Sequence, residues 1–148
     1  MSSMRTCPRR DLVGSAPMTD ADGTARNLLA ELEDVLATHD LDQMVDLFTD
    51  DVVLIGNDSE NWNRDETVAY LSVMADMKFT VRWEWHRVAV VLSAPGLLAF
   101  AAAGTMGFFD QSGQLDGDRE PFRVTCLAVE DRGRWRLRHF HGSDPKAD

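Results

Sequence analysis

Two histidines near the end of the chain, His139 and His141, carry the side chain best suited to acid–base chemistry. Imidazole titrates near neutral pH, so His139 could donate or accept a proton in catalysis. The alternative for His139 is a core histidine hydrogen-bonded to a backbone carbonyl or to a neighbouring carboxyl group. His141 lies nearer the end of its segment, which favours a pocket rim or a subunit contact. Asp58, in a polar loop, could act as a base if shielded from water, or could be an exposed turn residue.

Other residues could bind a ligand rather than transform it. Arg123 has a planar guanidinium that could hold an anionic or carbonyl group, although it could equally pair with Glu84 or Glu120. Trp62 stands beside the polar loop, which predicts a place at the mouth of a pocket. Trp85 lies in an aromatic-rich stretch, where core packing is the default and contact with a ligand is the functional alternative.

Metal and cofactor chemistry find little support in the residue pattern. His139 and His141, two residues apart, resemble half of a metal site that Glu84 and His86 could complete, but no spacing links the two pairs. The sequence contains no Ser-His-Asp order, phosphate-cradling glycine loop or nucleotide-binding fingerprint. We therefore predict a site with no metal and no cofactor.

Composition and charge indicate one folded domain. The chain has 148 residues, of which 44% are hydrophobic, and no apolar run reaches the roughly 18 residues of a membrane span. Its net charge is −10, and residues 19–76 hold fifteen acids against two arginines. An acidic surface repels phosphate backbones, so we expect no nucleic-acid partner and no membrane association. Because the start lacks the apolar stretch of a secretory signal, we expect a cytoplasmic protein. Residues 1–18 are interpreted as a disordered tail or a misassigned start, residues 19–145 as the domain, and residues 146–148 as a tail.

Helices are predicted in the first half of the chain. Apolar residues at helical spacing predict a helix from about Asp20 to Thr38. Asp40, followed three residues later by Gln43, resembles a capping box that opens a short second helix. A short apolar strand, Val52–Ile55, and a third helix capped by Asn63 follow.

Strands are predicted in the second half, over 79–92, 97–109, 121–129 and 135–141. Short turns between them indicate an antiparallel meander, so the fold class is α+β, with three N-terminal helices packed on the concave face of the sheet. The strands are long enough that they must bend, and Gly104 and Gly107 are the expected bends or bulges. A bent, cone-shaped sheet covered by helices would enclose one pocket.

Strict alternation assigns the faces of the last strand. The set expected to face the pocket is Trp135, Leu137, His139 and His141. The set expected to face outward, where it suits a contact with a second copy, is Arg136, Arg138 and Phe140.

The closing segment RWRLRHFHGSDP, read with the Arg123-x-Thr125 element, resembles the end of SnoaL-like proteins of the nuclear-transport-factor-2-like superfamily. The segment ENWNRDETVAYL is similar to the family's Trp-x-Gly-Arg-Asp element, with Asn63 in place of the usual Gly. The resemblance covers residues 20–145. The association domain of calcium/calmodulin-dependent protein kinase has a similar ending, but Gly142 replaces an arginine there, which argues against a carboxylate site of that kind.

The resemblance implies the cone-shaped fold and a homodimer through the outer sheet face, and it favours a pocket-facing position for Arg123. Thr125 and His141 are further ligand-binding candidates. The superfamily hosts enzymes and plain binding modules alike, so the fold alone does not name a reaction. The first hypothesis is a cofactor-free acid–base enzyme of the isomerase, cyclase or dehydratase type that acts on an apolar small molecule. The alternative is a non-catalytic ligand-binding or dimerisation module.

Overall fold

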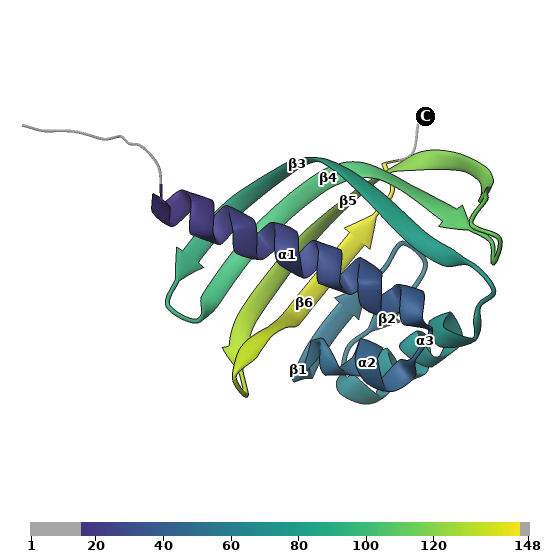
Figure 1. Cartoon of the computed structure of the whole chain (residues 1–148). Coiled ribbons are helices and arrows are strands. Elements are labelled where there is room, and N and C mark those ends of the chain that lie inside the picture. The colour runs from purple at the N-terminus through teal and green to yellow at the C-terminus, as the bar shows by residue number, and fades with distance from the viewer. Residues whose placement is uncertain (1–15, 146–148) are drawn as a thin grey trace, which may run out of the picture.

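The computed structural model describes residues 16–145, which form three helices and six strands in the order expected for an α+β domain (Figure 1). The helices are α1 (Ala16–Thr38), α2 (Leu41–Asp46) and α3 (Arg64–Asp76). The strands are β1 (Phe48–Ile55), β2 (Glu60–Asn61), β3 (Thr80–Ala94), β4 (Leu97–Phe109), β5 (Leu115–Asp131) and β6 (Arg134–Ser143). The fold class predicted from the sequence is confirmed, while the interpretation of residues 1–15 and 146–148 as tails lies outside the described residues.

Local sequence signals fix where the two shorter helices begin. The side chain of Asp40 accepts hydrogen bonds from the backbone N–H groups of Asp42 and Gln43, as a cap of α2 must. At α3, the Asn63 side chain accepts from the N–H of Glu66, and the Glu66 carboxylate accepts from the N–H of Trp62. The first helix begins at Ala16, four residues before the predicted start.

The six strands form one sheet in the order β2-β1-β6-β5-β4-β3. The meander β3–β6 is antiparallel, as predicted, and β1 pairs with β6 in parallel. Several strands extend beyond their predicted ends: β1 begins at Phe48, β3 extends to Ala94, β5 begins at Leu115, and β6 extends to Ser143. Pairing with Phe108 of β4 explains the extension of β5 through Asp116, a polar residue that reads as a turn position in isolation. Asp50 lies in the irregular stretch of β1 between Phe48 and Val53.

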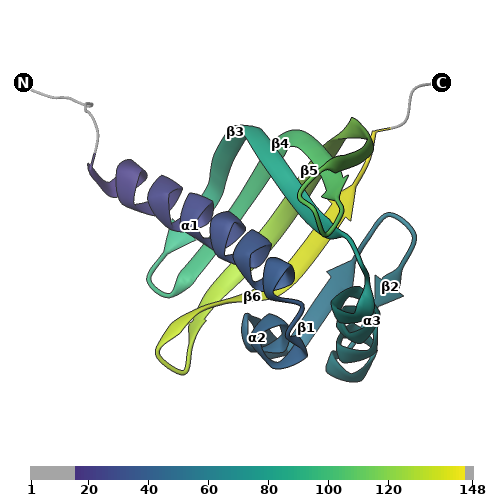
Figure 2. The ribbon, with the colours of Figure 1, turned by 45° about the vertical axis from the view of Figure 1, so that its right-hand side comes forward.

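The helices lie on the concave side of the sheet. Helix α1 runs diagonally across β3–β6, and α2 and α3 sit at one end, beside β1 (Figures 1 and 2). The core between these layers includes the fully buried side chains of Phe48, Phe100 and Leu137. On the outer edge of β3, the Glu33 carboxylate of α1 accepts a hydrogen bond from the backbone N–H of Trp83 at 2.6 Å. This contact satisfies part of an exposed sheet edge.

Two glycines mark irregularities of the sheet, as predicted. Gly104 lies opposite Trp85, where β3 bulges between Trp85 and Arg87. Gly107 lies in the register shift between β4 and β5. At Gly104 the two backbones approach so closely that an ideal Cβ would overlap the Glu84 carbonyl and lie 2.9 Å from the Trp85 Cα. The sheet therefore bends at a position that only glycine accommodates.

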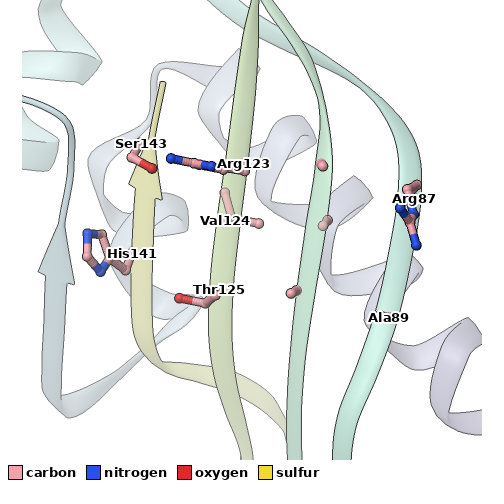
Figure 3. A pocket seen from close by; sticks show the side chains of 10 residues that line it. Arg87, Ala89, Arg123, Val124, Thr125, His141 and Ser143 are labelled. Atoms are coloured by element: carbon pink, nitrogen blue, oxygen red, sulfur yellow. The ribbon is translucent and has the colours of Figure 1, made fainter. Parts of the chain in front are cut away.

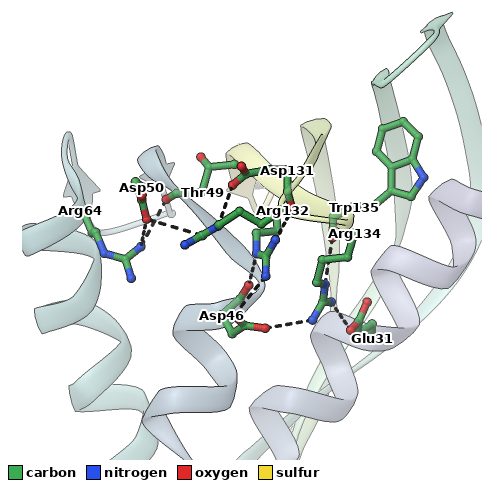
Figure 4. Close-up of polar contacts among 10 residues, drawn as sticks. Glu31, Asp46, Thr49, Asp50, Arg64, Asp131, Arg132, Arg134 and Trp135 are labelled. Carbon is green, nitrogen blue, oxygen red and sulfur yellow. Dashed lines mark hydrogen bonds and ion pairs between the residues drawn. The ribbon is translucent and has the colours of Figure 1, made fainter.

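An ion-pair network joins the β5–β6 hairpin to the helices (Figure 4). Arg134 contacts Glu31 of α1 and lies 3.1 Å from the Asp46 carboxylate at the end of α2. Arg136, only 6% exposed, donates to the Asp46 backbone carbonyl at 2.8 Å, to the Asp46 carboxylate and to the Asp131 carbonyl. These contacts hold α1, α2 and the hairpin together at the end of the sheet opposite loop 56–59.

Asp46 should make stability depend on pH. The hydrogen bond from Arg136 and the charges of nearby arginines lower the pKa of Asp46 below its ordinary value of 3.8. A carboxyl group whose pKa is lower in the folded state stabilises the fold above its unfolded pKa, and loses that contribution as the pH falls through its folded pKa. The wild type should lose unfolding free energy from roughly pH 5 down to pH 2 as Asp46 is protonated. We expect Asp46→Asn to lose less over this range, as measured by urea titration. An unchanged pH profile in this variant would contradict the assignment.

Candidate functional site

The side chains that could take part in catalysis or ligand binding line two hollows, one on each face of the sheet. The first, called the inner cavity below, has a volume of about 470 Å³ and lies between α1, α3 and the concave sheet face. Its walls are mostly apolar and come from every layer, with Leu36 of α1, Met74 of α3 and Phe122 of β5 among them. Such a volume and lining are typical of small-molecule sites. It corresponds to the pocket that the bent sheet predicts.

Asp58, Ser59 and Tyr70 form a polar corner of the inner cavity. Asp58 is exposed and lies in the loop after β1, so the residue predicted as a candidate base lines the cavity. Burial raises the pKa of Tyr70, and the charge of Asp58 raises it further, while a hydrogen bond with Ser59 opposes the shift. The Tyr70 phenol therefore keeps its proton at neutral pH and can donate a hydrogen bond.

Trp83 presents an unsatisfied donor on the opposite wall. Its indole Nε1 is buried and has no hydrogen-bond acceptor among residues 16–145. The ring stacks on Trp85 at 5.8 Å between centroids and on Phe122 at 6.2 Å. Buried donors normally find an acceptor, and this N–H has none among the described residues. Trp85, predicted to contact a ligand, instead packs behind Trp83 and does not line the inner cavity.

The two histidines face away from the inner cavity, which contradicts the predicted strand face. β6 pairs with β5 in regular register down to His139 opposite Leu127, but Leu137 then lies opposite Ala128, so Arg138 is an extra residue. Each inserted residue exchanges the faces of a strand. Leu137 and Phe140 are consequently buried on the concave side, while His139 and His141 project from the convex side.

His139 has the surroundings of a structural histidine. Its ring is half-buried, its Nδ1 lies 2.9 Å from the Val53 carbonyl of neighbouring β1, and its ring centroid is 6.3 Å from that of His141. This arrangement matches the core alternative, a histidine bonded to a backbone carbonyl. His139 is not in contact with the inner cavity, where a proton-transfer substrate would bind.

The convex face carries the second hollow, called the outer hollow, with a volume of about 430 Å³ (Figure 3). Its floor consists of Ala89, Ala101 and Ala103, and its polar groups are Arg87, Arg123, Thr125, His141 and Ser143. The ligand-binding candidates Arg123, Thr125 and His141 therefore all lie on the sheet face opposite the helices. Arg87 and Arg123 are the two arginines of the described part without an ion pair, and neither Glu84 nor Glu120 pairs with Arg123.

Further predicted placements require correction. Trp62, predicted at a pocket mouth, lines neither hollow. Its side chain is 59% exposed, and its indole N–H donates a hydrogen bond to the Glu60 carboxylate. Arg136 is buried in the ion-pair network rather than free on an outer face, and Phe140 points inward. Arg138 pairs with the Asp51 carboxylate at 3.0 Å. The outer-face set predicted for a subunit contact is thus wrong as a set.

Other chemistries find no support in the described residues. Within residues 16–145, no three His, Cys, Asp or Glu side chains gather in a way that could hold a metal ion. Cys126 is buried, and burial raises the pKa of its thiol far above the usual range, so it is a poor nucleophile. None of the helices in the same range combines the length and apolar composition that a membrane-spanning segment needs.

Comparison with known protein families decides the identity at family level. The profile of the SnoaL-like domain matches residues 25–147. The chain belongs to the SnoaL-like family. A comparison with curated proteins finds no match.

Solved structures agree with this SnoaL-like assignment at the level of the fold. A nuclear-transport-factor-2-like protein of unknown function from Pseudomonas putida is 18% identical, with 87% of this chain and 89% of that chain covered and a TM-score of 0.69. A protein from Streptomyces avermitilis, named as a candidate dehydratase of the same superfamily, is 14% identical, with 86% and 99% covered and a TM-score of 0.70. A candidate calcium/calmodulin-dependent protein kinase II association domain from Xanthomonas campestris is 20% identical, with 84% and 87% covered and a TM-score of 0.70.

Sequence reasoning missed most of the polar groups of the inner cavity in this SnoaL-like protein. Tyr70 lies in α3 four residues before Met74, so the two side chains share one face of the helix. This spacing was the signal that could have placed Tyr70 inward. Asp118, Glu120 and Asp144 also line the cavity. The first two were not recognised as strand residues because the strand was predicted to begin only at residue 121, whereas β5 begins at Leu115.

Proposed function

We propose that the inner cavity binds an apolar small molecule bearing a carbonyl group and that the protein transfers a proton within it without a cofactor. The observation that carries the proposal is that one mostly apolar cavity of about 470 Å³ is lined by Asp58, Tyr70 and Trp83, whose indole N–H lacks an acceptor among the described residues. Isomerases, cyclases and dehydratases need this combination of a base and hydrogen-bond donors in a dry site.

The roles follow from the chemistry of each group. Asp58 lies at the polar corner of the cavity and supplies the carboxylate that can act as the base. It would accept a proton from the carbon next to the carbonyl. The Tyr70 hydroxyl and the Trp83 indole N–H would donate hydrogen bonds to the oxygen on which negative charge develops.

Solvent deuterium exchange tests this proposal without knowledge of the natural product. 2-Acetylnaphthalene is an apolar ketone with exchangeable protons beside its carbonyl, and mass spectrometry in deuterated buffer follows their loss. The wild-type protein should accelerate this exchange. Asp58→Asn should reduce the acceleration by about a hundredfold or more while ketone affinity stays within about twofold. Tyr70→Phe should reduce it by at least about tenfold.

His139→Asn is the matched control, because His139 lies on the convex face. It should leave the exchange rate unchanged. Binding of the ketone without accelerated exchange would favour the alternative, a non-catalytic ligand-binding module. Loss of exchange in His139→Asn but not in Asp58→Asn would contradict the assignment of roles.

We further propose a homodimer through the convex sheet face. Ala103 lies between Arg87 on β3 and Arg123 on β5 in the sheet register, and all three residues are exposed. Ala103→Arg would add a third positive charge and a large side chain to a face of alanines. Sedimentation velocity should then show a dimer for the wild type and for the control Ala69→Arg, but a monomer for Ala103→Arg. A wild-type monomer would contradict this contact.

A further inference from the structure

Four polar side chains of the outer hollow form a compact group on the last two strands. In the antiparallel register, Arg123 of β5 lies opposite Ser143 of β6, and Thr125 lies opposite His141. Directly opposed residues have Cβ atoms about 5 Å apart, and alternate residues of a strand point to the same face. All four side chains line the hollow, and the Arg123 side chain extends toward Ser143 (Figure 3). The register therefore gathers them on one small area of the convex face.

Each of these four groups can donate hydrogen bonds. A guanidinium offers several N–H donors and no acceptor, each hydroxyl offers one donor, and an imidazole offers at least one. The Arg123 guanidinium also carries a positive charge and can hold two oxygens of a phosphate at once. Because its donors are several, a contact with one other acceptor would not exhaust them. A phosphate monoester, with three acceptor oxygens and a charge of about −1.5 to −2, matches this set of donors better than a carboxylate with two oxygens.

The rest of the outer hollow has a floor of small apolar side chains. Ala103 of β4 lies directly beside Arg123 in the register, and Ala101 lies in the next row. Arg87 of β3, on the other side of Ala103, adds a second positive charge at the far end of the hollow. Methyl side chains leave room above the sheet, and a volume of about 430 Å³ is typical of small-molecule sites. The hollow can therefore hold an apolar body next to its polar group.

We propose that the outer hollow binds a phosphate monoester of a small apolar molecule. The phosphate is held by Arg123, Thr125 and Ser143, and the apolar body lies on the alanine floor. This site goes beyond the proposed function, because it is on the sheet face opposite the inner cavity. Its donors all belong to one copy of the chain, so it does not require the homodimer. In a dimer through this face, the bound phosphate would lie between the copies and offset the charge of their arginines.

Titration calorimetry with phenyl phosphate, benzoate and benzyl alcohol tests the class of ligand. In a buffer without phosphate and at constant ionic strength, phenyl phosphate should bind at least about threefold tighter than benzoate, with benzyl alcohol weakest. Arg123→Met should lower the affinity for phenyl phosphate at least about fivefold, because it removes a charge and a contact to two oxygens. Thr125→Val, which replaces the hydroxyl by a methyl group, should lower it at least about twofold.

Two control variants locate the site. Arg132→Met removes the same charge from the exposed turn before β6, outside the hollow, and should leave the affinity for phenyl phosphate within about twofold. Tyr70→Phe, in the inner cavity, should also leave it unchanged. The inference is overturned if phenyl phosphate binds no more tightly than benzoate, if Arg132→Met loses as much affinity as Arg123→Met, or if Tyr70→Phe loses affinity. None of these results affects the ketone exchange that tests the proposed function, so the two proposals can fail separately.

Discussion

Gly104→Ala is expected to lower the free energy of unfolding by about 3 kcal/mol, or to prevent folding, because the added methyl group has no space. An ideal Cβ at Gly104 would overlap the Glu84 carbonyl and lie 2.8 Å from its carbon. The obstruction is backbone of the paired strand β3, so rotation of a side chain cannot relieve it. Relief requires β3 and β4 to separate at the bend that shapes the inner cavity.

Urea titration followed by tryptophan fluorescence measures this effect, with Gly23→Ala as the matched control. Gly23 lies in α1 with nothing within 4 Å of an added Cβ. Alanine is the better helix former there, so the control should gain about 0.5 to 1 kcal/mol. Equal stabilities of the two variants would show that the close contact at Gly104 is incorrect.

Arg136→Met is expected to lower the free energy of unfolding by about 2 to 4 kcal/mol. Methionine retains the length of the side chain but removes the donors that satisfy the backbone carbonyls of Asp46 and Asp131. The Asp46 carboxylate is 55% exposed and regains hydrogen bonds with water. The larger part of the effect therefore comes from the two backbone carbonyls that are left without a donor.

Arg26→Met is the control for loss of an arginine ion pair. Arg26 pairs with Asp22 across one turn of α1, with both side chains about half exposed. Exposed pairs of this kind contribute about 0.5 kcal/mol or less. If both variants lose the same stability in urea titration, the hairpin is not anchored through Arg136.

Much of the fold could be predicted because its signals are local. The caps at Asp40 and Asn63 were read from residue types three positions apart, and each makes the expected contact. The bends at Gly104 and Gly107 followed from glycine inside long strands. Strand ends such as Leu115 depend on a partner strand distant in sequence, and were therefore placed too late in the chain.

The candidate site could be predicted less well because it depends on register. One extra residue, Arg138, reverses the faces of β6 from His139 onward. Alternation assumes an uninterrupted strand, and nothing in the local sequence announces the bulge. Asp58 lies in the loop predicted after the first strand, because turn residues mark that loop locally, whereas Trp83 and Tyr70 needed the assembled layers to show that they share a cavity.

The most direct test of the central claim, that the inner cavity binds the ligand, is a titration of the four tryptophan indole N–H signals by nitrogen-15 NMR. Trp83→Phe and Trp62→Phe assign the two decisive signals. On addition of 2-acetylnaphthalene, the Trp83 signal should shift as its N–H gains an acceptor, and the Trp62 signal should stay in place. A Trp83 signal that stays in place when the ketone is added would contradict this claim.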